Sequence, residues 1–149
     1  MSGQRLYWAL DDDLTEVDVA GEAWDAHAEN DGATPGANTW RTPSDRQPVA
    51  AESNGFNATC GAQGQAADVI TFEFEGTNAN LPNHANAVWA PIGTVSLTLV
   101  GASTEFTGGS FDGGWRHVRF SRWQVSTANA IAEVNVQVGI ITGPGRGPR

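Results

Sequence analysis

Apolar and polar residues alternate through most of the second half of the chain. Four stretches carry the pattern: 70–75, 94–99, 117–121 and 133–140. Successive residues of a strand point to opposite faces, so each stretch has one apolar and one polar face. Such faces are typical of antiparallel sheets that cover a core on one side. The pattern predicts one core, formed by Phe72, Phe74, Leu97, Leu99, Val118, Phe120, Val134, Val136 and Val138.

The first thirty residues predict a hairpin and a short helix. Apolar residues alternate over 6–10 and again over 17–19, and the acidic run 11–13 separates the two stretches. Two short strands around a polar turn form a plausible opening hairpin. The segment 21–29 is rich in alanine, the best helix former, and predicts one short helix.

The segment from about 32 to 64 shows little periodicity and many Pro and Gly residues, which predicts an extended arm or a long loop. Structureless segments of this length often serve contacts, and Trp40 is its candidate anchor. The Gly- and Pro-rich residues 143–149 predict a flexible tail, which leaves 1–142 as a single domain.

Composition agrees with this picture. A chain of 149 residues with 40% apolar residues fits one packed domain, and 18 Gly and 7 Pro favour many turns and short strands. We therefore predict an all-β protein: an antiparallel, jelly-roll-like β-sandwich with a long irregular arm and at most one short helix.

Charge narrows the choice of partners. Seventeen acidic residues against eight basic ones give a net charge of −9, which predicts no binding to nucleic acid or to an anionic membrane. The start of the chain lacks the apolar run of a signal peptide, so we expect synthesis in the cytoplasm. Residues 1–31 hold nine acidic and one basic residue, whereas 115–149 hold five Arg and one acidic residue. This polarity favours head-to-tail association of copies.

The sequence predicts no catalytic centre and no cofactor. The three histidines lie far apart without zinc-site spacing, and the single Cys60 predicts a small packed residue. Asp11, Asp12 and Asp13 are a weak candidate for Ca²⁺ binding, although adjacent carboxylates in a turn more often face water. We therefore expect a protein that is not an enzyme.

The segment Trp115–Trp123 carries the main functional hypothesis. If Val118 and Phe120 face the core, then Trp115, Arg119 and Trp123 share the opposite face with His117 and Ser121. That face is either covered by the chain itself, an interface between subunits, or a platform for sugar rings. Trp and Arg concentrate at interfaces. The candidate interface residues are Trp40, Trp115, Arg119 and Trp123.

Resemblances to two known classes of protein suggest two functions for this chain. The stretch Phe111–Phe120, with its Asp-Gly-Gly-Trp turn, and the alternating stretch Ala132–Val138 resemble the late strands of jelly-roll carbohydrate-binding modules. This resemblance implies a jelly-roll fold and a glycan as a possible partner.

The chain as a whole is similar in type to small structural proteins of tailed-virus particles, through its size, β-sandwich pattern, long arm and polarised charge. That resemblance implies a virion protein, a capsid decoration, spike or tail component, made in the host cytoplasm. It would act through contacts with copies of itself and with other virion proteins. This is the leading hypothesis, and the carbohydrate-binding module is the alternative.

Overall fold

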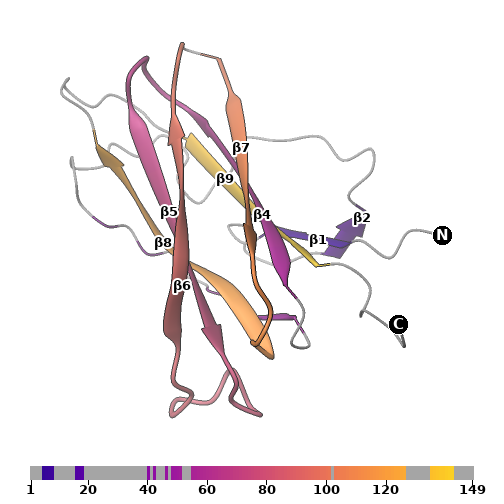
Figure 1. The fold of residues 1–149 in the computed structure, drawn as a ribbon. Coiled ribbons are helices and arrows are strands. Elements are labelled where there is room, and N and C mark those ends of the chain that lie inside the picture. The colour runs from indigo at the N-terminus through magenta and orange to yellow at the C-terminus, as the bar shows by residue number, and fades with distance from the viewer. Residues whose placement is uncertain are drawn as a thin grey trace.

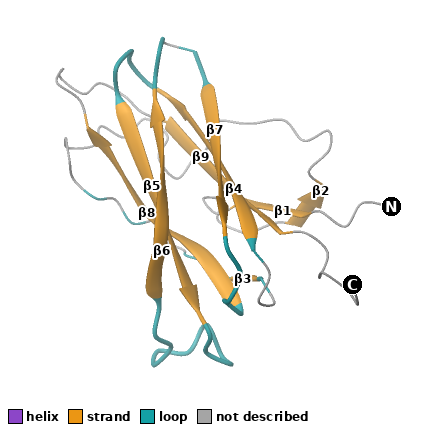
Figure 2. Ribbon diagram, in the orientation of Figure 1, coloured by secondary structure: helices purple, strands orange, loops and turns teal. Residues whose placement is uncertain are grey.

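All the regular elements of the described part of the chain are β-strands (Figure 1). The computed structural model describes residues 5–8, 16–18, 40, 42, 46, 48–51, 55–101, 103–126 and 135–142. No described segment is helical (Figure 2). The described residues therefore contain no helix that could span a membrane. The helix expected at 21–29, the acidic turn 11–13, Val134 and the tail 143–149 lie outside the described residues. The strands are β1 (Arg5–Trp8), β2 (Glu16–Asp18), β3 (Val49–Ala50), β4 (Phe56–Gln63), β5 (Val69–Thr77), β6 (Ala90–Thr98), β7 (Glu105–Phe111), β8 (His117–Ser126) and β9 (Asn135–Thr142).

The strands form two antiparallel sheets that pack face to face. Sheet A has the order β2-β1-β9-β4-β7, and sheet B has the order β3-β8-β5-β6. Figure 1 shows the two layers, with β5, β6 and β8 in one and β4, β7 and β9 in the other. This arrangement confirms the predicted all-β sandwich.

The expected opening hairpin is present. β1 and β2 pair antiparallel, with Leu6 opposite Val17. The other edge of β1 pairs with β9, so Arg5 lies opposite Thr142. β9 in turn pairs with β4 along its whole length, which places the last described strand in the middle of sheet A.

The core lies between the sheets and is apolar. Of the nine residues predicted for it, all but the undescribed Val134 are buried. Four phenylalanines and one partly buried phenylalanine form a chain of ring contacts through it, with centroid separations of 4.8–6.2 Å. These rings are Phe56, Phe72, Phe74, Phe111 and Phe120.

Three strands were missed by the sequence pattern, of which the two-residue β3 (Val49–Ala50) lies inside the predicted arm. Residues 56–63, which the pattern assigned to the arm, form β4 in sheet A. Its core positions alternate as expected, but after Phe56 they are Ala58, Cys60 and Ala62, whose small side chains give a weak hydrophobic signal. β7 has Gly108 and Gly109 at its middle, and glycine has a low propensity for β-strands, so the pattern did not predict a strand there.

Two register shifts disturb sheet B around Glu73–Glu75. Between β5 and β8, Glu73 pairs with Arg122 but Phe74 pairs with Phe120, so Ser121 is an extra residue. Between β5 and β6, Phe74 pairs with Gly93 and Glu75 with Pro91, so Ile92 is extra. Such β-bulges change which face the following residues occupy.

β6 and β7 approach each other closely across the sandwich. A methyl group built on Gly109 would lie 2.6 Å from Val95 Cγ2, and one on Gly93 would lie 3.0 Å from the Phe111 ring. Only a residue without a side chain permits approaches this close. The two edge strands, one from each sheet, therefore face each other closely across the sandwich.

Candidate functional site

The outer face of sheet B carries paired charges. Glu73 and Glu75 alternate with buried phenylalanines on β5 and therefore point away from the core. Arg122 Nε donates to Glu73 Oε1 at 2.7 Å, and Arg119 Nε donates to Glu75 Oε1 at 3.0 Å. Both arginines belong to β8, whose antiparallel register sets them opposite these carboxylates. Directly opposed unlike charges stabilise a strand pair.

Arg46 extends this network from outside the sheet. Its Nη1 lies 3.5 Å from Glu75 Oε1, so Glu75 contacts two guanidinium groups. The side chains of Glu75 and Arg119 are each 15% exposed. Burial lowers the pKa of Arg119, and its hydrogen bond to Glu75 opposes that effect. The pair is therefore largely shielded from water.

Two tryptophans stack on the same arginines. The Arg119 guanidinium carbon lies 4.0 Å from the centroid of Trp89, and that of Arg122 lies 4.2 Å from the centroid of Trp40. Both rings are partly exposed. A guanidinium over an aromatic face is attracted by about 0.5–1 kcal/mol at such sites. We call this set the Arg–Trp face: Trp40, Arg46, Glu73, Glu75, Trp89, Arg119 and Arg122.

The structure separates the four residues expected at an interface. Trp40 contacts Arg122 of its own chain, and Arg119 lies on the outer face as predicted. The placement of Trp123 on that face is wrong: it is 1% exposed and lies in the core opposite Phe72. The extra residue Ser121 is the physical reason, because it shifts the alternation by one position.

Trp115 also lies away from the expected face. It precedes β8 and packs against the core cluster. A methyl group built on Gly76 would lie 2.4 Å from Trp115 Cδ2, so the ring rests on the backbone of β5 on the side of Phe74. Its placement beside Arg119 is therefore wrong too, because the ring fills the space that a glycine leaves.

Trp89 and Arg122 were not predicted as members of the site. Trp89 precedes β6 in a Pro- and Asn-containing loop, and only the fold brings it over β8. Arg122 could have been predicted from the sequence. The apolar residues Trp123 and Val125 lie three and five residues after Phe120, and this odd spacing indicates that the alternation of faces changes after Phe120.

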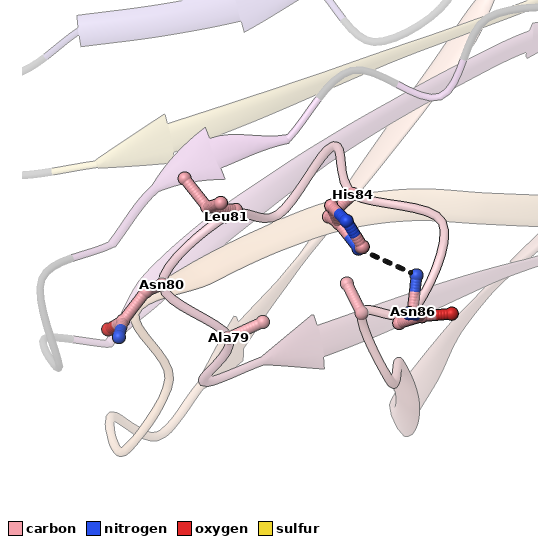
Figure 3. Close-up of a pocket in the computed structure, with 6 residues that line it drawn as sticks. Ala79, Asn80, Leu81, His84 and Asn86 are labelled. Atoms are coloured by element: carbon pink, nitrogen blue, oxygen red, sulfur yellow. Dashed lines mark hydrogen bonds between the residues drawn. The ribbon is translucent and has the colours of Figure 1, made fainter.

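A second feature is a hollow of about 260 Å³ in the loop between β5 and β6 (Figure 3). Its lining comprises Ala79, Asn80, Leu81, His84, Asn86 and Ala87. The loop has a defined shape because Asn86 donates its backbone N–H to His84 Nδ1 at 3.1 Å. It is also fixed from outside, since Arg116 donates its backbone N–H to Asn78 Oδ1 at 2.8 Å and its guanidinium to Asn80.

The described residues contain no cluster of three or more His, Cys, Asp or Glu side chains suited to a metal ion. The buried ionisable groups lie apart: Asp68 Oδ2 accepts the backbone N–H of Gln65 in a turn, and Cys60 lies in the core. Burial lowers the pKa of His117, and nearby Arg116 adds to this, so the neutral ring is favoured. That the chain is not an enzyme stays a prediction.

Cys60 is expected to resist thiol reagents in the folded protein. The side chain is 0% exposed, and burial raises the pKa of the thiol far above its ordinary value. Because the thiolate is the reactive form, both effects suppress the reaction. Titration with an aromatic disulfide should detect no free thiol in buffer and one per chain in denaturant. Rapid reaction in buffer would contradict the burial of β4 in the core.

Comparisons with known proteins identify no family. No family model matches the chain, and no curated protein matches it. Among solved structures, one similar chain is described as "Family 16 Carbohydrate Binding Module-2". The two are 6% identical, the TM-score is 0.32, and the match covers 66% of this chain and 70% of that one. This similarity is too low to carry an argument about function, and the resemblance to virion proteins stays a prediction.

Proposed function

We propose that this protein is a non-catalytic binding module whose Arg–Trp face holds a carbohydrate. One observation carries the proposal: two partly exposed tryptophan rings lie on one sheet face, each with a guanidinium against it. Each guanidinium is in turn hydrogen bonded to a glutamate of β5. The rings are therefore held in place before any ligand binds, which reduces the entropy cost of binding.

The chemistry of the face suits a sugar. The C–H side of a pyranose ring is apolar and can pack on a flat indole, while its hydroxyls need donors and acceptors around the ring. Arg and Glu side chains provide both, and hydrogen bonds to charged groups are the stronger kind. Thr71 and Ser96, whose hydroxyl oxygens lie 3.4 Å apart, add uncharged partners on the same face.

The distribution of apolar side chains favours a sugar over a protein at this face. The centre of a protein interface is usually apolar and shielded from water. Of the exposed large apolar side chains of the described residues, Phe106 lies on β7 in the other sheet, and only Val88 is a chain neighbour of a residue of this face. The Arg–Trp face combines aromatic rings with paired charges and hydroxyls, which is the composition expected for a polyhydroxylated ligand.

Trp89→Ala is expected to weaken glycan binding by about tenfold or more, because it removes one stacking ring. A glycan array would identify the ligand, and calorimetry would then compare the variants. Phe106→Ala is the matched control, since it removes an exposed aromatic ring from sheet A. Full binding by both Trp89→Ala and Trp40→Ala would contradict the proposal.

A second candidate is the virion structural protein, a capsid decoration, spike or tail component. The observation that favours it is the exposure of large apolar side chains, among them Leu81, Val100 and Phe106, which suits contacts with other proteins. A glycan-binding face would serve host recognition in such a component. Mass spectrometry of gradient-purified particles from the source tests this candidate directly, and absence of the chain from the particles would remove it.

A further inference from the structure

The outer edge of β6 is unpaired among the described strands, and β6 is the longest strand at an edge of either sheet. The other edges are β2, with three residues, β3, with two, and β7, whose centre is a glycine pair. An exposed edge offers free backbone N–H and C=O groups to another strand. Short edges offer few such groups, so β6 is the edge best suited to pairing.

Only the first residues of this edge are protected against pairing with another strand. Pro91 and the bulge at Ile92 interrupt the first residues of β6, and both features normally prevent strand pairing. From Gly93 to Thr98 the strand contains no charged residue, no proline and no bulge. Soluble monomers usually place a lysine or another charge on such an edge. The unprotected stretch therefore has the properties of a contact surface.

The residue types of this stretch are arranged symmetrically about Ser96. Thr94 and Thr98 are exposed on the outer face, while Val95 and Leu97 are buried on the core face. In an antiparallel pair centred on Ser96, Thr94 lies opposite Thr98 of a second copy and Val95 lies opposite Leu97. Every pair then joins side chains of one kind, and the two-fold axis repeats each contact on both of its sides.

Two neighbouring features agree with a second copy of this chain as the occupant. The Ser96 hydroxyl oxygen already lies 3.4 Å from that of Thr71 on β5, so Ser96 opposite Ser96 continues a row of hydroxyls across the axis. Thr–Thr and Thr–Ser pairs stabilise adjacent strands. Glu73, opposite Thr94 on β5, is already paired with Arg122 and so adds little repulsion.

We propose that two copies pair through β6 in antiparallel orientation about Ser96, which joins two four-stranded sheets into one continuous sheet. The pairing does not depend on glycan binding, because the Arg–Trp face lies mainly over β5 and β8.

Sedimentation equilibrium tests the proposal on the full chain. The wild type should show twice the monomer mass of 15.7 kDa. Ser96→Lys places two ammonium groups opposite each other at the axis and should weaken the dimer by about 100-fold. Ser96→Glu should do the same, whereas an equimolar mixture of the two variants should form a heterodimer. Ser110→Lys, an equivalent change on the edge strand β7, should leave the dimer intact.

Salt separates this dimer from a head-to-tail association between the acidic start and the Arg-rich end. Two copies with a net charge of −9 repel each other, so screening should strengthen the β6 pair. Screening would instead weaken contacts between opposite charges. A monomeric wild type, dimers of Ser96→Lys as stable as wild type, or dissociation by salt would each overturn the proposal. Circular dichroism confirms that each variant is folded.

Discussion

Trp123→Ala is expected to lower the free energy of unfolding by about 3–5 kcal/mol, the largest effect of any substitution considered for this chain. Trp123 is the largest fully buried side chain, and its removal leaves a cavity opposite Phe72 in the middle of sheet B. Surrounding strands cannot close over such a space without moving the phenylalanine cluster. Urea unfolding followed by circular dichroism would measure the change.

The matched control for Trp123→Ala is Trp89→Ala. Trp89 is a partly exposed ring on the outer face of the same sheet, and its loss should cost about 1 kcal/mol. Equal losses for the two variants would contradict the bulge at Ser121, because a regular strand places position 123 outside. Trp123→Phe keeps part of the ring volume and provides a measurable value if the alanine variant fails to fold.

Gly76→Ala is expected to destabilise the protein by about 1–3 kcal/mol, the cost typical of overpacking. An alanine in place of glycine within a strand is ordinarily neutral or stabilising, because glycine loses more entropy on folding. Here the new methyl group would lie 2.4 Å from Trp115 Cδ2 and 2.7 Å from Cγ, so the indole must leave its place. Thermal unfolding would show the sign directly.

Two further variants identify the cause of this effect. Trp115→Ala should make the added methyl group harmless, so the double variant should be no less stable than Trp115→Ala alone. Gly101→Ala is the control for the glycine itself, since a methyl group there meets nothing within 4 Å. A neutral Gly76→Ala would show that the Trp115 ring does not rest on β5.

Much of sheet B could be predicted because its strands alternate large apolar and polar residues. The pattern identified Phe72 and Phe74, and it identified Leu97 and Leu99. It failed for β4, where small residues fill the core beside large rings of the opposite sheet. A hydrophobic pattern is detected from large apolar side chains. Close packing of the core requires only that the side chains of the two facing sheets together fill the volume between them.

The candidate site was less predictable, and the reasons differ between residues. The outward position of Arg119 follows from simple alternation. Trp123 was misplaced because one extra residue reverses the alternation for the rest of the strand. Trp40 was identified as an anchor, yet the pattern could not say that it contacts its own chain. The contact of Trp89 with Arg119 joins positions 30 residues apart in the sequence, and local patterns contain no such information.

The position of β9 between β1 and β4 has a consequence for biosynthesis. A ribosome releases β1 first and β9 last among these strands, yet sheet A needs β9 to join the β1–β2 hairpin to β4 and β7. Until residue 142 leaves the exit tunnel, the nascent chain holds two separate parts of that sheet with unpaired edges. Pairings between distant parts of a chain form slowly because the intervening loop must close first. Sheet A is therefore completed only after translation of the domain has ended, and sheet B is the part that can assemble earlier.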